Sequence, residues 1–220
     1  VFSSTAYSSM LLKAILHIRR PKWVILDFNI DGTIGNKTTF RQKMLHYAVS
    51  KADGIVTISK AEEITLKERF PQLIDKIVFI HEGVDTQFFK PDLLVPEENF
   101  ILSVGYNPDR DFKTVIEATK DLGIALVLAT KPSRVEHLQP LPSHVTVKSF
   151  SHEEMQLVYK KAKIVVIGLN LKADNNDSMG TFAVAEALAM GKAVVVTKSK
   201  SLESYIEDGV SGRFVPIHDV

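Results

Sequence analysis

The residues best suited to chemistry lie in one stretch, residues 178–197, which reads SMGTFAVAEALAMGKAVVVT. Its pattern predicts a loop, a helix and a buried strand, with Asp177 or Ser178 capping the helix. Gly180 has no side chain to block a ligand, and the first N–H groups of a helix have no partner inside that helix. The stretch therefore predicts a phosphate site at the start of the helix, formed without a lysine.

Glu186 is the one charged residue in the run 182–190, which also contains four alanines. Burying an unpaired carboxylate is costly, so hydrogen-bond donors must lie nearby. Two adjacent hydroxyls of a ribose would serve as such donors. The alternative is a structural carboxylate bonded to the backbone or to an arginine such as Arg110.

The other acids and the histidines carry weaker signals. The seven histidines show no spacing typical of metal ligands, so we predict no metal site and expect them at the surface or in caps. Asp27 and Asp31 follow an apolar run, and α/β proteins place ligand-facing loops after such strands. Capping of that loop is the alternative that we favour for both aspartates.

Eight short runs rich in valine and isoleucine alternate with longer helical patterns. The runs begin at Trp23, Gly54, Lys76, Asn99, Ile124, His144, Lys163 and Lys192. Runs that are apolar throughout are typical of strands buried on both faces, which predicts parallel sheets in an α/β doubly wound, Rossmann-like architecture. Helices are expected at residues 10–20, 61–70, 112–121, 153–162 and 181–190. Ser151 and Glu154 form a capping-box pattern at the fourth of these helices.

The periodicity stops at residues 83–98, which contain two prolines and predict a linker. We therefore expect an incomplete N-terminal Rossmann-like domain at residues 1–90 and a C-terminal Rossmann-like domain at residues 91–220. The length of 220 residues fits one domain plus part of another. The chain lacks an initiator methionine, so we interpret its start as an internal cut, and we expect the C-terminal domain to be truncated as well.

Composition restricts the classes of partner. Lys and Arg total 27 against 26 for Asp and Glu, so no net charge favours nucleic acid. The absence of cysteine fits a reducing compartment, and the cytoplasm is the expected location. No apolar run is long enough to span a bilayer. An association of the N-terminal domain with the inner face of a membrane stays open.

The ordered pieces between residues 48 and 217 resemble the GT-B retaining glycosyltransferases of the group 1, family 4 type. These pieces include NFILSVG, IALVLAT, SHEEMQLVYKKAKIVVIGL, GTFAVAEALAMGKAVVVT and ESYIEDGVSGRFVP. Upstream, ADGIVTISKAEEITLKERFP and KIVFIHEGVDTQFFKP resemble the passage between the two domains of that family. The resemblance implies a nucleotide-sugar-binding C-terminal domain and a fragment of the acceptor-side N-terminal domain.

Carried over by position, the resemblance assigns roles in the 178–197 stretch. Glu186 matches the second acid of the family's Glu-x7-Glu motif and is implied to bind the donor ribose. Ser178 falls on the first acid, which contacts the donor sugar in the family, and a serine there is a departure. The residues implied to hold the sugar hydroxyls and the diphosphate through their amides are Met179, Gly180, Thr181 and Phe182.

A second departure follows Gly105, which the resemblance places in the donor site. Tyr106 replaces the family's arginine, and Asp111 replaces its lysine. Arg110 lies one residue from the lysine position and is expected to form a bidentate pair with the diphosphate. The alternative is a surface ion pair between Arg110 and Asp109 or Asp111.

The resemblance implies transfer of a hexose, with retention, from a nucleotide diphosphate sugar to a saccharide or lipid-linked acceptor. It implies Arg110 and Ser178 as catalytic residues. No metal or other cofactor is expected. Glycan, lipopolysaccharide or glycolipid synthesis is the expected setting. The sequence leaves open whether the donor carries UDP, GDP or ADP. Two alternatives remain, a sugar-nucleotide epimerase of the same fold and a non-catalytic nucleotide-sugar-binding module. We expect the 220-residue piece alone to be a poor catalyst.

Overall fold

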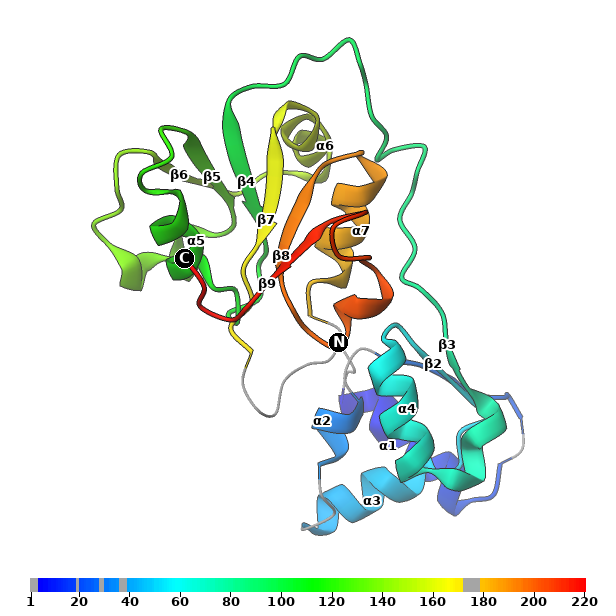
Figure 1. Cartoon of the computed structure of the whole chain (residues 1–220). Helices are drawn as coiled ribbons and strands as arrows, with labels where there is room; N and C mark the ends of the chain where they lie inside the picture. Colours follow the sequence, from blue (N-terminus) through cyan, green and yellow to red (C-terminus); the bar gives the residue numbers. More distant parts are fainter. Residues whose placement is uncertain (1–3, 19, 28–29, 36–38, 172–178) are drawn as a thin grey trace. The chain divides into compact units, whose positions relative to one another are not determined.

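The computed structural model describes residues 4–18, 20–27, 30–35, 39–171 and 179–220. Contacts divide the chain into two compact units, one ending at His81 and the other comprising Glu82–Lys172 and Met179–Val220 (Figure 1). Each unit contains a parallel sheet flanked by helices, as the apolar runs predicted. Among the described residues, no helix is long and apolar enough to cross a membrane.

The first unit has a three-stranded sheet in the order β1-β2-β3. Its strands are β1 (Val24–Asp27), β2 (Gly54–Thr57) and β3 (Ile77–Phe79). Its helices are α1 (Ser4–Ile15), α2 (Ile30–Ile34), α3 (Phe40–Val49), α4 (Lys60–Arg69) and the 3-10 helix η1 (Pro71–Lys76). The sheet and helices enclose an apolar core in which Ile55, Leu66 and Phe70 are fully buried.

The second unit has a six-stranded sheet in the order β6-β5-β4-β7-β8-β9, with every pair parallel. Its strands are β4 (Phe100–Val104), β5 (Ala125–Ala129), β6 (Val145–Lys148), β7 (Ile164–Ile167), β8 (Val194–Thr197) and β9 (Arg213–Val215). The chain runs outward from β4 to β6 and then returns to β7, beside β4. In such sheets, ligands bind at the carboxyl ends of the strands where the direction of the winding changes.

The helices of the second unit begin where the sequence pattern placed them, to within one residue. They are α5 (Phe112–Thr119), α6 (His152–Lys161) and α7 (Thr181–Ala189), together with the 3-10 helices η2 (Pro132–Arg134), η3 (Glu136–Leu138) and η4 (Leu202–Ser204). The predicted capping box is present: Ser151 Oγ accepts from the N–H of Glu154, whose carboxylate accepts from the N–H of Ser151. This reciprocal pair fixes the start of α6.

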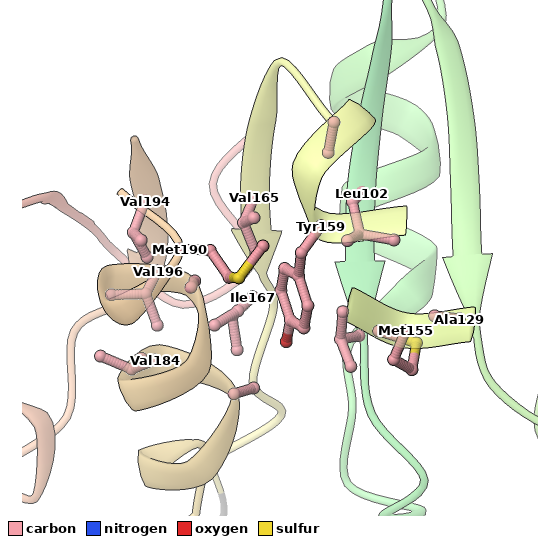
Figure 2. Close-up of a cluster of buried hydrophobic side chains, with 14 of the residues drawn as sticks. Leu102, Ala129, Met155, Tyr159, Val165, Ile167, Val184, Met190, Val194 and Val196 are labelled. Carbon is pink, nitrogen blue, oxygen red and sulfur yellow. The ribbon is translucent and has the colours of Figure 1, made fainter. Parts of the chain in front are cut away.

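The main core of the second unit also includes part of the segment predicted as a linker. Figure 2 shows this core between the sheet and the helices α6 and α7, with side chains such as Leu102, Tyr159 and Ile167. Phe89 is buried in the same core, and Val84 packs against it. The contacts therefore divide the chain between His81 and Glu82, whereas the sequence analysis placed the division after residue 90.

Three elements differ from the sequence expectations. The helix expected at residues 10–20 is α1, which ends at Ile15, and His17 just beyond it has the left-handed φ of 53° that stops a helix. Strand β9 was not predicted, because a three-residue run bounded by an arginine gives little period-two signal. Helix α3 was not predicted either, although Leu45, Ala48 and Val49 form a short buried face at helical spacing.

Candidate functional site

The start of α7 differs from the predicted capping. Gly180 is the N-cap, with a left-handed φ of 93° and no side-chain cap hydrogen bond. The prediction that Asp177 or Ser178 caps the helix is therefore wrong, because a glycine takes this backbone conformation without strain and begins the helix itself. The two predicted residues, including the proposed catalytic Ser178, lie outside the described residues.

Arg110 follows β4 and lies inside the second unit. Its backbone forms an isolated antiparallel bridge with Leu169, just after β7. Its Nε and Nη1 atoms are buried and have no hydrogen-bond partner among the described residues. Asp111 pairs instead with His218, whose Nδ1 lies 2.7 Å from Asp111 Oδ2, and with Thr114. Among the described residues, Arg110 therefore does not form the surface ion pair that was the alternative.

The structure brings Gly105, Arg110 and Gly180 together. A Cβ added at Gly105 would lie 2.0 Å from Arg110 Nε, closer than two such atoms can approach. A Cβ added at Gly180 would lie 3.6 Å from Arg110 Nη1. The guanidinium therefore lies against the end of β4 on one side and the start of α7 on the other. A glycine at position 105 is required for this placement.

The charge at this point is positive and uncompensated by a neighbouring carboxylate within the described residues. Burial lowers the pKa of Arg110 to about 10, which still leaves the guanidinium protonated at neutral pH. The N-terminus of an α-helix adds a partial positive charge of roughly half an elementary charge. A buried cation without a partner is unfavourable, and an anion bound here would relieve it.

Glu186 lies about one and a half turns into α7, where it is half-buried. Its Oε2 accepts a hydrogen bond from the hydroxyl of Tyr159 at 2.9 Å. Burial raises the pKa of Glu186, while the Tyr159 hydrogen bond and the charge of His152 act in the opposite direction. Among the described residues the partner of this carboxylate is thus a tyrosine of α6, and neither the backbone nor Arg110 holds it. The sequence analysis missed Tyr159, which reads as an ordinary core residue.

Glu82 is a second carboxylate at α7 that the sequence analysis missed. Its Oε2 accepts a hydrogen bond from Thr181 Oγ1 at 2.6 Å, and its backbone N–H donates to the Tyr205 hydroxyl at 2.8 Å. Burial raises the pKa of Glu82 to about 7, and the charge of Glu186 adds to the rise. Nothing in the sequence around Glu82, which precedes a Gly-Val-Asp sequence, predicted its hydrogen bond with Thr181.

The other residues predicted to bind the donor, on either side of the first residue of α7, differ in how far they are buried. Thr181 is fully buried, Met179 belongs to the core at 4% exposure, and Phe182 is 55% exposed. The described residues include no group of three His, Cys, Asp or Glu side chains that could hold a metal ion. The prediction that no metal takes part stays a prediction.

A cavity of about 540 Å³ lies on the α5 side of Arg110. It is lined by residues from the β4–α5 connection and α5, with Asn170, His137 and His218. No residue of α7 lines it, so the cavity touches the candidate site only through Arg110. We therefore locate the site from the side-chain contacts and not from this cavity.

A family model described as Glycosyl transferases group 1 matches residues 109–220. No curated protein sequence matches the chain.

Solved structures resemble the chain along nearly all of its length. A sucrose-phosphate synthase from Thermosynechococcus elongatus matches with a TM-score of 0.74 and 19% identity, over 97% of this chain and 59% of the synthase. The Anabaena protein HepE, in complex with UDP and glucose, matches with a TM-score of 0.70 and 16% identity, over 97% of this chain and 63% of HepE. A glycosyltransferase from Rickettsia africae matches with a TM-score of 0.63 and 13% identity, over 99% of this chain and 69% of that protein. At these identities, the likeness shows the GT-B fold, and the chain spans about three fifths of the first two proteins.

Proposed function

Because the chain belongs to the Glycosyl transferases group 1 family, we propose that it carries the donor-binding half of a retaining hexosyltransferase. The observation that carries this proposal is the buried guanidinium of Arg110, which lacks a partner among the described residues and lies beside the start of α7. A diphosphate is the anion that suits this place, because its oxygens accept from both a guanidinium and the amides of a helix N-terminus.

The two ends of the donor fall on different residues of α7. Arg110 and the helix start around Gly180 bind the diphosphate, and Gly105 leaves room for the arginine. Glu186 lies one to two turns further along the helix and accepts from the ribose hydroxyls. On the sugar side, we assign Ser178 a neutral contact with the hexose, and Met179, Thr181 and Phe182 contacts through their backbone amides.

The proposed reaction breaks the bond between the anomeric carbon and the oxygen of the β-phosphate. An acceptor hydroxyl oxygen forms the new bond on the same face, and its proton moves to the departing phosphate oxygen. Negative charge grows on the β-phosphate as the bond breaks, so Arg110 and the helix dipole stabilise the transition state more than the ground state. Retention and independence of a metal are part of the proposal.

UDP-sugars are the first donors to test. HepE was crystallised with UDP and glucose and with UDP-glucose, and the similar fold makes the same nucleotide a reasonable starting point here. The acceptor is proposed to be a saccharide or a lipid-linked saccharide, in glycan, lipopolysaccharide or glycolipid synthesis on the cytoplasmic side of a membrane.

Calorimetry and a release assay test the proposal. The chain is titrated with UDP, GDP and ADP, and we expect one of them to bind with a Kd in the micromolar to millimolar range. The matching nucleotide hexose is then incubated with the protein, with and without saccharide acceptors, and nucleotide release is followed. Release that needs an acceptor supports transfer. Turnover to an epimeric sugar without an acceptor supports the epimerase instead, and binding without any turnover supports a non-catalytic module.

A further inference from the structure

Tyr159 is the largest of the fully buried side chains among the described residues, and it lies on α6, outside the 178–197 stretch that carries Glu186. Figure 2 shows its ring among apolar side chains that include Leu102 and Ile167. Phe89 meets the ring edge to face, with 6.0 Å between centroids. The ring is therefore held on several sides and has little freedom to move its hydroxyl.

The hydroxyl of Tyr159 donates a hydrogen bond of 2.9 Å to Glu186 Oε2. Glu186 lies on another helix, 27 residues later in the chain. An ionised carboxylate only accepts hydrogen bonds, so the phenol is the donor in this pair. Tyr159 is the one hydrogen-bond partner of the Glu186 carboxylate within the described parts of the chain. One carboxylate oxygen is thus held by a rigid donor, and Oε1 is left for another donor.

We propose that Tyr159 is a positioning residue of the donor site: it holds Glu186 Oε2 so that Oε1 presents to the ribose of the nucleotide. This inference rests on the proposed function, because it requires that Glu186 binds a ribose. A carboxylate held through one oxygen is also preorganised, so less conformational entropy is lost when the ribose binds. Tyr159 acts through Glu186 and does not itself contact the ligand.

The electrostatic surroundings of Glu186 give the pair a second effect. Burial raises the pKa of this carboxyl, and Glu82, which carries a like charge when ionised, lies close enough to interact with it. The Tyr159 hydrogen bond and the charge of His152 lower its pKa. Arg110 acts on Tyr159 and favours its ionised form, but burial keeps the pKa of the phenol well above its usual value. Tyr159 therefore favours the ionised form of Glu186, against the effect of burial.

The test is the Tyr159→Phe variant, which removes one oxygen and keeps the ring that fills the core. We expect it to bind the nucleotide about tenfold more weakly than the wild type, the loss typical of a hydrogen bond to a charged group. In the chain without ligand, carboxyl NMR should show the Glu186 titration midpoint at higher pH in the variant, with the signal assigned through Glu186→Gln. Tyr47→Phe, at an exposed tyrosine of the first unit, is the matched control and should change neither quantity.

A double-mutant cycle separates positioning from a general structural role. In the Glu186→Gln background, Tyr159→Phe should cost almost no further nucleotide affinity, because the two changes remove the same interaction. An unchanged Glu186 midpoint, or a tenfold loss that persists in that background, overturns the inference. If the wild type binds none of UDP, GDP and ADP, the proposed function fails and the ribose role fails with it. If the wild type binds a nucleotide and Tyr159→Phe changes neither its affinity nor the Glu186 midpoint, the inference fails while the proposed function stands.

Discussion

The hydroxyl of Thr181 donates a hydrogen bond of 2.6 Å to Glu82 Oε2, which joins the first residue of α7 to the residue that begins the second unit. Thr181 is fully buried, and the backbone N–H of Glu82 is held by Tyr205. The carboxyl of Glu82 is thus half-buried with Glu186 nearby, and no cation pairs with it among the described residues. Its ionisation is therefore unfavourable in the folded chain.

The first prediction concerns stability against pH. The pKa of Glu82 is raised from 4.5 to about 7. Between these values the folded chain keeps a proton that the unfolded chain has released, so the free energy of unfolding falls as the pH rises through this window. Glu82→Gln is neutral throughout and keeps an acceptor for Thr181. Above pH 7 it should be more stable than the wild type by roughly 2 kcal/mol.

Urea denaturation at pH 5, 6, 7 and 8 measures this difference. Glu207→Gln, at an exposed glutamate of the same unit, serves as the control and should follow the wild type at every pH. Parallel curves for Glu82→Gln and the wild type across this range would show that Glu82 ionises normally.

The second prediction is that replacing Arg110 stabilises the fold but weakens nucleotide binding. Replacing a buried cation that lacks a partner by an apolar side chain of similar length removes a desolvation cost. Arg110→Met should therefore raise the free energy of unfolding by about 1–3 kcal/mol and weaken nucleotide binding about 100-fold. Arg213→Met changes an exposed arginine that is 3.6 Å from Asp208 and should do neither. A destabilised Arg110→Met variant with normal affinity would contradict the proposed role.

The third prediction concerns the glycine that makes room for Arg110. In Gly105→Ala the new Cβ would fall 2.0 Å from Arg110 Nε and 2.7 Å from its Cδ, so the guanidinium must move. We expect nucleotide affinity to fall about tenfold, because the charged hydrogen bonds lose their geometry. Gly83→Ala is the matched control, since no atom lies within 4 Å of its added Cβ. Calorimetry on the two variants checks the difference, and equal affinities would place Arg110 outside the binding site.

The fourth prediction is an acid limb in donor binding. Burial raises the pKa of Glu186, so protonation should weaken ribose binding at a pH above the ordinary 4.5 of a glutamate. Nucleotide hexose is the better probe, because a free terminal phosphate has its own pKa of about 6. Affinity for the wild type should fall as the pH drops through the Glu186 titration. In Glu186→Gln the affinity should be low at neutral pH and should lack this fall.

Much of the second unit could be predicted from sequence because the signals are local. The apolar runs that became β4, β5, β7 and β8 are buried and short, and the capping box of α6 needs only Ser151 and Glu154. Strand β9, whose local signal is weak, was missed, and so was helix α3. The α/β class and the start of α7 did not depend on them.

The partners of the site residues were harder to predict, because they come from distant parts of the chain. Glu186 is held by Tyr159, 27 residues earlier, and Thr181 by Glu82, 99 residues earlier. The aspartates beside Arg110 suggested a surface pair, but its backbone bridge to Leu169 places the arginine at the sheet, where these neighbours do not reach it. Sequence patterns identify such residues one by one, while their pairing depends on the tertiary fold.

The burial of Phe89 has a practical consequence for anyone preparing the second unit alone. Phe89 and Phe100 lie in the same core, whereas Leu93 and Leu94 between them are 99% and 93% exposed. A protease that nicks the chain at these leucines would leave both ends anchored, so the cleavage point would misplace the edge of the folding unit. A recombinant fragment that starts at residue 91 would lose Phe89 and the Glu82 contact together, and should expose apolar surface and aggregate. One that begins at or before Glu82 keeps both.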